Sequence, residues 1–183
     1  TMHSTFVTDV ANSTAHRPSR EGLAKRVLAD SALFPVLLNI ALDTKNKSHH
    51  KACWILELVF ENDLSLLDTY LETFCNTLKD YTHEGAIRSI SKICLFLAAR
   101  WKKQPATLSA KQKEQLTEAC FDWLIDPAGK VANKAYAMRA LYILGKDTDW
   151  VYPELQRILT EDFTKHSAAY KSAAKELLQK LKI

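Results

Sequence analysis

The sequence contains few of the residues that interrupt helices and form tight turns. Its 183 residues include only four glycines and five prolines. A β-sheet protein of this length would need more of both, because they mark most sharp reversals of a chain. The scarcity therefore favours long helices with few connections, in a chain large enough to bury one continuous core.

Cysteine pairs of the kind that form metal sites or disulfide frameworks are also absent. The four cysteines, Cys53, Cys75, Cys94 and Cys120, are 22, 19 and 26 residues apart and lie in apolar stretches. This spacing favours buried thiols in a reducing compartment. We therefore expect a cytoplasmic protein without a structural metal ion.

No apolar run in the sequence is long enough to cross a membrane, which takes about 18 uncharged residues. The first ten residues, TMHSTFVTDV, also lack the apolar region of a signal peptide. The net charge of +4 is mildly basic and well below that of a nucleic-acid-binding tail. We expect no membrane association.

The sequence carries none of the common catalytic or nucleotide-binding motifs, such as GxGxxG, GxxxxGK[ST], HExxH or GxSxG. His49 and His50 are adjacent and would point about 100° apart on a helix, so they make a poor pair of metal ligands. Asp147 and Asp149 precede a predicted helix, a position at which aspartate commonly caps the backbone N–H groups of the first turn. We therefore expect no catalytic residue and no cofactor.

Helical periodicity extends through most of the chain. Residues 1–18 are polar and predict a flexible N-terminal arm, and Ser19 can begin a short helix. One helical-repeat domain is expected over residues 19–183. Its further helices are predicted at 31–43, 49–61, 64–80, 85–102, 109–125, 132–145, 150–163 and 167–181.

Local signals predict several helix boundaries. Ser109 and Gln112 have the spacing of a capping box, in which each side chain bonds the backbone N–H of the other residue. Gly145 is expected at the C-terminal end of a helix. Either Asp149 or Tyr152 is expected to cap the helix that follows.

The predicted helices carry an internal repeat. In four units a basic residue is followed by a small or apolar residue three positions later and by leucine seven positions later. The units are Lys51, Trp54, Leu58; Arg88, Ser91, Leu95; Lys134, Ala137, Leu141; and Lys171, Ala174, Leu178. An aspartate precedes each basic residue by eight or nine positions: Asp43, Asp80, Asp126 and Asp162.

These helix pairs, with basic residues 37, 46 and 37 positions apart, resemble the HEAT and armadillo-like α-solenoid family. The segment Ile87-Arg88-x-x-Ser91-x-x-x-Leu95 is similar to the second helix of a HEAT unit. The resemblance covers about residues 31–181. It implies an all-α, right-handed α-α superhelix of about four helix pairs, preceded by a short N-terminal helix.

The recurring aspartates and basic residues are expected to have a structural role. They can pair with one another, as Asp126 could with Lys134, or complement the exposed backbone groups at helix ends. Exposed pairs of this kind contribute only about 0 to 1 kcal/mol each.

Charge is divided between the two helices of each unit. The first-helix segments 63–83, 111–126 and 147–162 hold thirteen acidic and four basic residues. The second-helix segments 51–61, 84–103, 130–146 and 165–182 hold fifteen basic and four acidic residues. The resemblance implies that second helices line a concave face, which would then be basic and attract an anionic partner. The partner-binding residues predicted there are Arg88, Lys92, Lys134, Arg139, Lys171 and Lys175. The alternative is a charge-sorted solvated surface that keeps the protein soluble.

We therefore expect a non-enzymatic scaffold or adaptor that binds a macromolecular partner, a protein with acidic character, through its basic face. The alternative is a nucleic-acid-binding protein, because the resemblance extends to HEAT-like DNA-repair glycosylases. Those enzymes need a concave aspartate flanked by aromatic residues, and no such set can be matched in this sequence.

Overall fold

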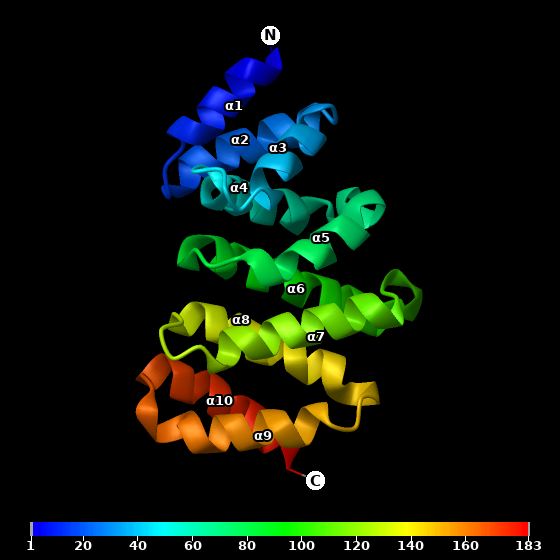
Figure 1. Cartoon of the computed structure of the whole chain (residues 1–183), viewed down its shortest axis with the longest axis vertical. Helices are drawn as coiled ribbons and strands as arrows, with labels where there is room; N and C mark the ends of the chain where they lie inside the picture. The colour runs from blue at the N-terminus through cyan, green and yellow to red at the C-terminus, as the bar shows by residue number, and fades with distance from the viewer. Residues whose placement is uncertain (1, 183) are drawn as a thin grey trace. The chain divides into compact units, whose positions relative to one another are not determined.

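The computed structural model of the chain describes residues 2–182, which form helices and loops (Figure 1). The α-helices are α1 (Met2–Asn12), α2 (Arg17–Ala29), α3 (Leu33–Leu42), α4 (His49–Asn62), α5 (Leu71–Thr77), α6 (Glu84–Lys103), α7 (Ala110–Ile125), α8 (Val131–Leu144), α9 (Val151–Asp162) and α10 (Ala168–Leu181). Short 3-10 helices are η1 (Leu64–Tyr70), η2 (Leu78–Asp80), η3 (Pro105–Thr107), η4 (Gly145–Asp147) and η5 (Phe163–Lys165). No strand occurs within residues 2–182, so the predicted all-α fold is confirmed.

Seven of the eight helices predicted between residues 31 and 181 are single α-helices near the expected bounds. The eighth, at 64–80, is divided into η1, α5 and η2. Its first turn begins at Asp63, whose carboxylate accepts hydrogen bonds from the Ser65 backbone N–H at 3.1 Å and hydroxyl at 2.5 Å. Local bonding of this kind favours a turn over a regular helix.

Across the described helices, none has the length and apolar character that a membrane span requires.

The predicted N-terminal cap of α7 is confirmed. At the start of α7 the Gln112 backbone N–H donates to the Ser109 hydroxyl at 3.1 Å, and the Ser109 N–H donates to the Gln112 side chain at 2.9 Å. The predicted cap of α9 by Asp149 or Tyr152 is wrong. The residue at that position is Trp150, and no side chain caps there.

Gly145 ends α8, as predicted, and its lack of a side chain is required by close packing. A Cβ at this position would lie 2.7 Å from the aromatic ring of Tyr152. The Tyr152 hydroxyl in turn donates to the Tyr142 backbone carbonyl at 2.7 Å. The glycine therefore allows α9 to start directly against the end of α8.

Residues 2–18 include the segment for which a flexible N-terminal arm was predicted. Most of it forms α1, in which Phe6 and Val10 are fully buried. The two residues are four positions apart, so they share one face of the helix. That face packs on α3 and α4, and Arg26 of α2 pairs with Asp9 at 2.6 Å. A short apolar stripe thus anchors a segment whose average composition is polar.

We predicted a single domain from residue 19 onward, whereas the chain divides into two compact units. Unit 1 extends to Ile90 and unit 2 begins at Ser91, so the boundary lies within α6. In unit 1, α2 and α3 both pack against α4. The Tyr81 hydroxyl, after η2, donates to the Ala41 carbonyl of α3 at 2.6 Å and thereby joins two helix pairs of this unit.

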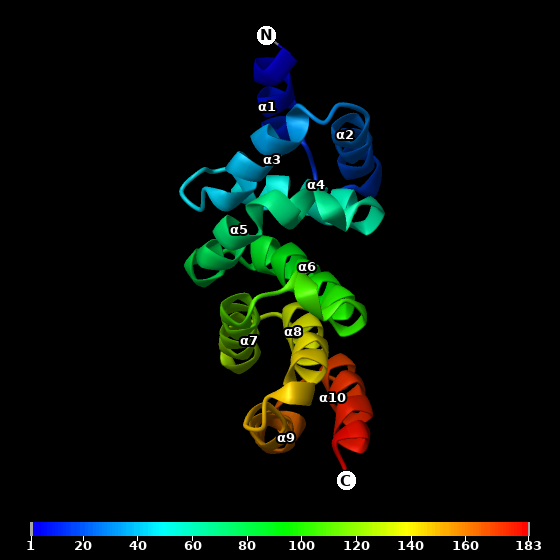
Figure 2. The ribbon, with the colours of Figure 1, turned by 90° about the vertical axis from the view of Figure 1, so that its right-hand side faces the viewer.

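Unit 2 is a two-layered helical array. Figure 2 shows α7 and α9 in one layer and α8 and α10 in the other. Helix α8 packs against α7, α9 and α10, and its Met138 and Leu141 are completely buried. Tyr170 and Leu177 supply the buried side of α10. Helices α9 and α10 each bury one stripe in this array, so their opposite sides remain exposed.

The capping box gives a direct test of the start of α7. Replacing Ser109 with alanine removes the acceptor for the Gln112 N–H and should lower the free energy of unfolding by about 1 kcal/mol. Ser109→Asp keeps an acceptor and is the matched control, with little loss expected. Urea unfolding followed by circular dichroism measures both, and equal stability of the alanine and aspartate variants would contradict the capping role.

Candidate interaction surfaces

The six basic residues predicted to contact a partner differ in their exposure. Arg88 in unit 1 is exposed, as is Lys175 in unit 2; Lys92, Arg139 and Lys171 are half-buried, and Lys134 is buried. A common charge and register in the sequence therefore do not give them a common environment.

Lys134 is enclosed in unit 2, so its predicted partner-binding role is wrong. Its side chain is only 1% exposed, and the ammonium group donates to the Leu124 backbone carbonyl at 2.8 Å. Leu124 is the penultimate residue of α7, where carbonyl groups have no partner within the helix. The charge of Lys134 is thus used to join the end of α7 to the start of α8.

The repeated basic position has the same structural use in unit 1. The ammonium of Lys51 donates to the carbonyl of Ala11, the penultimate residue of α1, at 2.7 Å. The prediction that this register complements backbone groups at helix ends is confirmed for these two lysines. The preceding aspartates stabilise turns: Asp43 and Asp126 each accept the backbone N–H two positions ahead, at 3.2 and 2.9 Å.

Two predicted residues of α10 lie near one depression between α9, η5 and α10, which we call the basic hollow. Lys175 lines it, and the Lys171 ammonium lies 6.0 Å from the ring centroid of Phe163, another lining residue. The hollow has a volume of about 620 Å³. Its lining residues are Gln156, Thr160, Phe163, Thr164, Lys175, Leu178, Gln179 and Lys182. They include two lysines and no carboxylate.

The other predicted residues do not line this hollow. The Lys92 ammonium lies 5.9 Å from the ring centroids of both Phe96 and Tyr136, so its stem covers aromatic surface of α6 and α8. Arg139 is half-buried on α8. The structure therefore associates Lys171 and Lys175 with one site and places Lys92 in a different aromatic environment.

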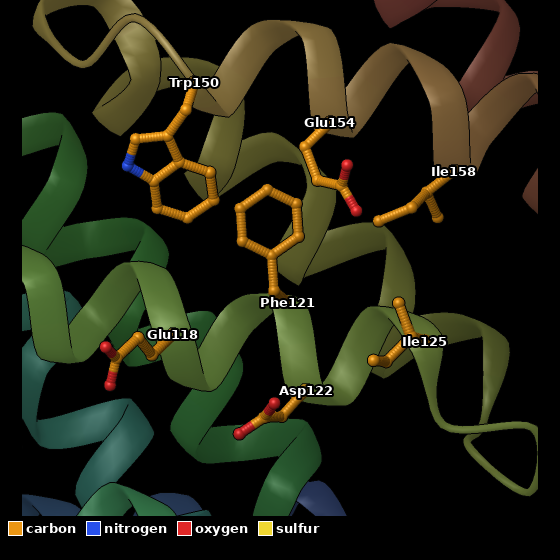
Figure 3. A pocket seen from close by; sticks show the side chains of 7 residues that line it. All are labelled: Glu118, Phe121, Asp122, Ile125, Trp150, Glu154 and Ile158. Carbon is orange, nitrogen blue, oxygen red and sulfur yellow. The ribbon is translucent and has the colours of Figure 1, made fainter.

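A second depression, which we call the acidic groove, lies between α7 and α9 (Figure 3). Its volume is about 450 Å³. The lining residues are Glu118, Phe121, Asp122 and Ile125 of α7 with Trp150, Glu154 and Ile158 at the start and along α9. Figure 3 shows Phe121 and Ile125 pointing from α7 toward α9, and Trp150 reaching down beside Phe121.

The floor of the acidic groove is apolar and partly open to solvent. The Trp150 and Phe121 rings stack with centroids 5.4 Å apart and an interplanar angle of 27°. Trp150 is 52% exposed and Ile125 is 54% exposed, whereas Phe121 and Ile158 are buried. Two large apolar side chains thus flank a firmly packed base.

Carboxylates form the rim of the acidic groove. Glu118 and Asp122 are exposed on α7, and no ion pair within residues 2–182 neutralises either of them. Glu154 is paired with Arg157 at 2.5 Å, and this hydrogen bond holds the pKa of the Glu154 carboxyl below its usual value. The α7 side of the rim therefore carries the uncompensated negative charge.

The acidic groove was not predicted from the sequence. One usable signal was present: residues 150, 154 and 158 recur every four positions and form one stripe on α9. Pairing this stripe with Phe121 requires tertiary structure, since the two residues are far apart in the sequence. The predicted capping role of Asp147 is also replaced, because its carboxylate pairs with Lys113 of α7, which lowers the pKa of Asp147.

Three histidines gather in unit 1 where α4 and α6 begin. The His50 and His83 rings stack with centroids 4.1 Å apart, and His49 lies 5.6 Å from His83. The Nδ1 atom of His83 accepts the Gly85 backbone N–H at 3.0 Å, so this side chain supports the first turn of α6. Among the described residues, no group of three or more His, Cys, Asp or Glu side chains has the arrangement of a metal site.

In a comparison with protein families, the chain matches a model described as HEAT repeat domain over residues 10–181. No curated protein and no solved structure shows significant similarity to the chain. The matched region covers most of both units and includes the repeated register from Asp43 to Leu178, so the HEAT-like resemblance inferred from the sequence is confirmed.

The buried contact of Lys134 predicts a large loss of stability on truncation. Lys134→Ala removes packed methylene groups and leaves the Leu124 carbonyl without its donor, so we expect a loss of about 2 to 4 kcal/mol in the free energy of unfolding. Lys175→Ala, the same change at an exposed position, should shift it by less than about 0.5 kcal/mol. Urea unfolding that shows equal effects for both would contradict the structural role of Lys134.

The histidine cluster predicts lower stability in acid. Burial, followed by the nearby His83 and His49, lowers the pKa of His50 from its usual 6.5. Between the folded and unfolded pKa values the unfolded chain binds more protons, so stability falls as the pH drops through about 6.5. Replacing His50 with glutamine should flatten this dependence in unfolding curves measured between about pH 7.5 and 5.

The exposed His16→Gln variant is the control for a general effect of losing a histidine. An undiminished pH dependence in the His50 variant would contradict the assignment. Retained dependence in the control together with a flatter profile for the His50 variant would support it.

Proposed function

Because the chain belongs to the HEAT repeat family, we propose that it is a non-enzymatic scaffold that binds a protein partner. Helical repeats present extended surfaces, and the partner contacts would lie on the sides of the helices that the core leaves exposed. Basic side chains of the second-helix layer are the proposed binding groups, with the exception of the buried Lys134.

The basic hollow is the observation that supports this proposal most directly. Lys171, Lys175 and Lys182 surround or line a depression that also contains Phe163 and Leu178. An acidic protein segment could place carboxylates near the ammonium groups and an apolar side chain on the phenylalanine. The combination of an apolar base with charged surroundings provides both contact area and selectivity for charge.

Cysteine chemistry agrees with a binding role. All four cysteines are buried, and burial raises the pKa of Cys53 and of Cys75 to about 12. Since the thiolate is the reactive form, these two thiols are poor nucleophiles. Buried thiols also support our proposal of a reducing compartment, the cytoplasm, as the site of action.

Charge reversal in the basic hollow tests the proposed partner surface. In the Lys171→Glu/Lys175→Glu variant, we expect an acidic partner to bind at least about tenfold more weakly, because attraction becomes repulsion. Affinity capture from cells that make the protein would identify the partner, and titration of the purified pair would measure its dissociation constant. Lys180→Glu is the matched control on α10, because Lys180 is exposed, pairs with Glu176 and does not line the hollow.

Loss of partner binding in the double variant alone would support the basic hollow, and equal binding by all variants would contradict it. Titration with duplex DNA at low and high salt separates the nucleic-acid alternative. Binding to DNA with a steep dependence on salt would favour that alternative, and no binding at low salt would exclude it.

A further inference from the structure

We propose that the acidic groove between α7 and α9 is a second docking site, which accepts a basic protein segment carrying an aliphatic or aromatic anchor. The site differs from the basic hollow in charge and in the side of α9 that it uses. Trp150, Glu154 and Ile158 line the acidic groove, whereas Gln156 and Thr160 line the basic hollow. Helix α9 would therefore form one wall of two binding sites of opposite preference.

The exposed apolar side chains define what the centre of the groove can bind. Trp150 and Ile125 remain more than half exposed, although Phe121 and Ile158 beneath them are buried. Tryptophan contributes strongly to protein interfaces because it buries a large area with few rotatable bonds. An aliphatic or aromatic side chain from a partner would cover this floor and remove Trp150 and Ile125 from water.

The rim determines the charge of that partner. Glu114, Glu118 and Asp122 recur every four residues along α7, a spacing at which like charges repel and destabilise a helix. Glu118 and Asp122 both line the acidic groove, which has no lysine or arginine among its lining residues. Cations on a partner would relieve the repulsion along α7, so a segment with lysine or arginine beside its apolar anchor is the complementary occupant.

The length of the groove fits a short segment. Glu118 and Ile125 are seven residues apart on α7, which corresponds to about 10 Å along the helix axis. Two turns of a partner helix cover the same distance, so one apolar face with basic residues three or four positions away would match both the floor and the rim.

Selection from a random phage-displayed library of peptides about 12 residues long tests the proposal, with the full chain as the target. We expect enriched peptides to combine lysine or arginine with tryptophan, phenylalanine or leucine. A synthetic copy of an enriched peptide, labelled with a fluorophore, then gives the dissociation constant by anisotropy. Trp150→Ala should weaken its binding by about tenfold or more.

Two further variants separate binding from folding and one surface from the other. Glu118→Gln/Asp122→Asn changes only exposed carboxylates and should weaken binding by about threefold at low salt, with a smaller effect at high salt. Lys171→Glu/Lys175→Glu alters the basic hollow and should leave the binding of this peptide unchanged. The proposals for the two docking sites can thus be disproved independently of each other.

Peptide binding that requires both Trp150 and the α7 carboxylates would support the proposal. Enrichment of acidic peptides, no enrichment, or binding that survives both sets of changes would overturn it. Sedimentation of the chain alone tests whether a second copy of the chain occupies the acidic groove. A dimer that Trp150→Ala converts to a monomer would also overturn the proposal.

Discussion

The contact between the Lys134 ammonium and the Leu124 carbonyl is the interaction on which the arrangement of unit 2 depends. It ties the end of α7 to the start of α8 inside the core, where a cation is tolerated only if it is well bonded. By fixing α7 on α8, it also fixes Phe121 and Ile125 opposite α9. The acidic groove therefore rests on a buried polar contact as well as on apolar packing.

The need of carbonyl groups at helix ends for a hydrogen-bond donor distinguishes the structural lysines from the exposed ones. Helix ends have unbonded carbonyl groups, and Lys51 and Lys134 satisfy two of them. Lys171 and Lys175 continue the basic composition into α10 but lie around Phe163 at the surface. The repeated basic position thus stabilises the fold at Lys51 and Lys134, whereas at Lys171 it lies beside Phe163 near the basic hollow.

Much of the helical architecture could be predicted from the sequence because it depends on local signals. Periodicity located α3, α4 and α6 to α10, and the Ser109–Gln112 spacing located the start of α7. Helix α1 was missed because only Phe6 and Val10 anchor it, which leaves its composition polar. Exposure was harder to predict: Lys134 and Lys175 look alike in sequence, and the stacking of Trp150 on Phe121 depends on helix packing rather than on spacing along the chain.

Together these features describe a helical-repeat unit with an acidic and a basic depression on opposite sides of α9. Nuclear magnetic resonance of the 15N-labelled chain, titrated with a Lys/Arg-rich peptide selected for binding, tests this account most directly. We predict that the Trp150 indole signal and the amide signals of Glu118–Ile125 and Trp150–Ile158 shift, while those of Lys171–Lys182 in α10 do not. Shifts concentrated on α10, or no shift of the Trp150 indole, would contradict the account.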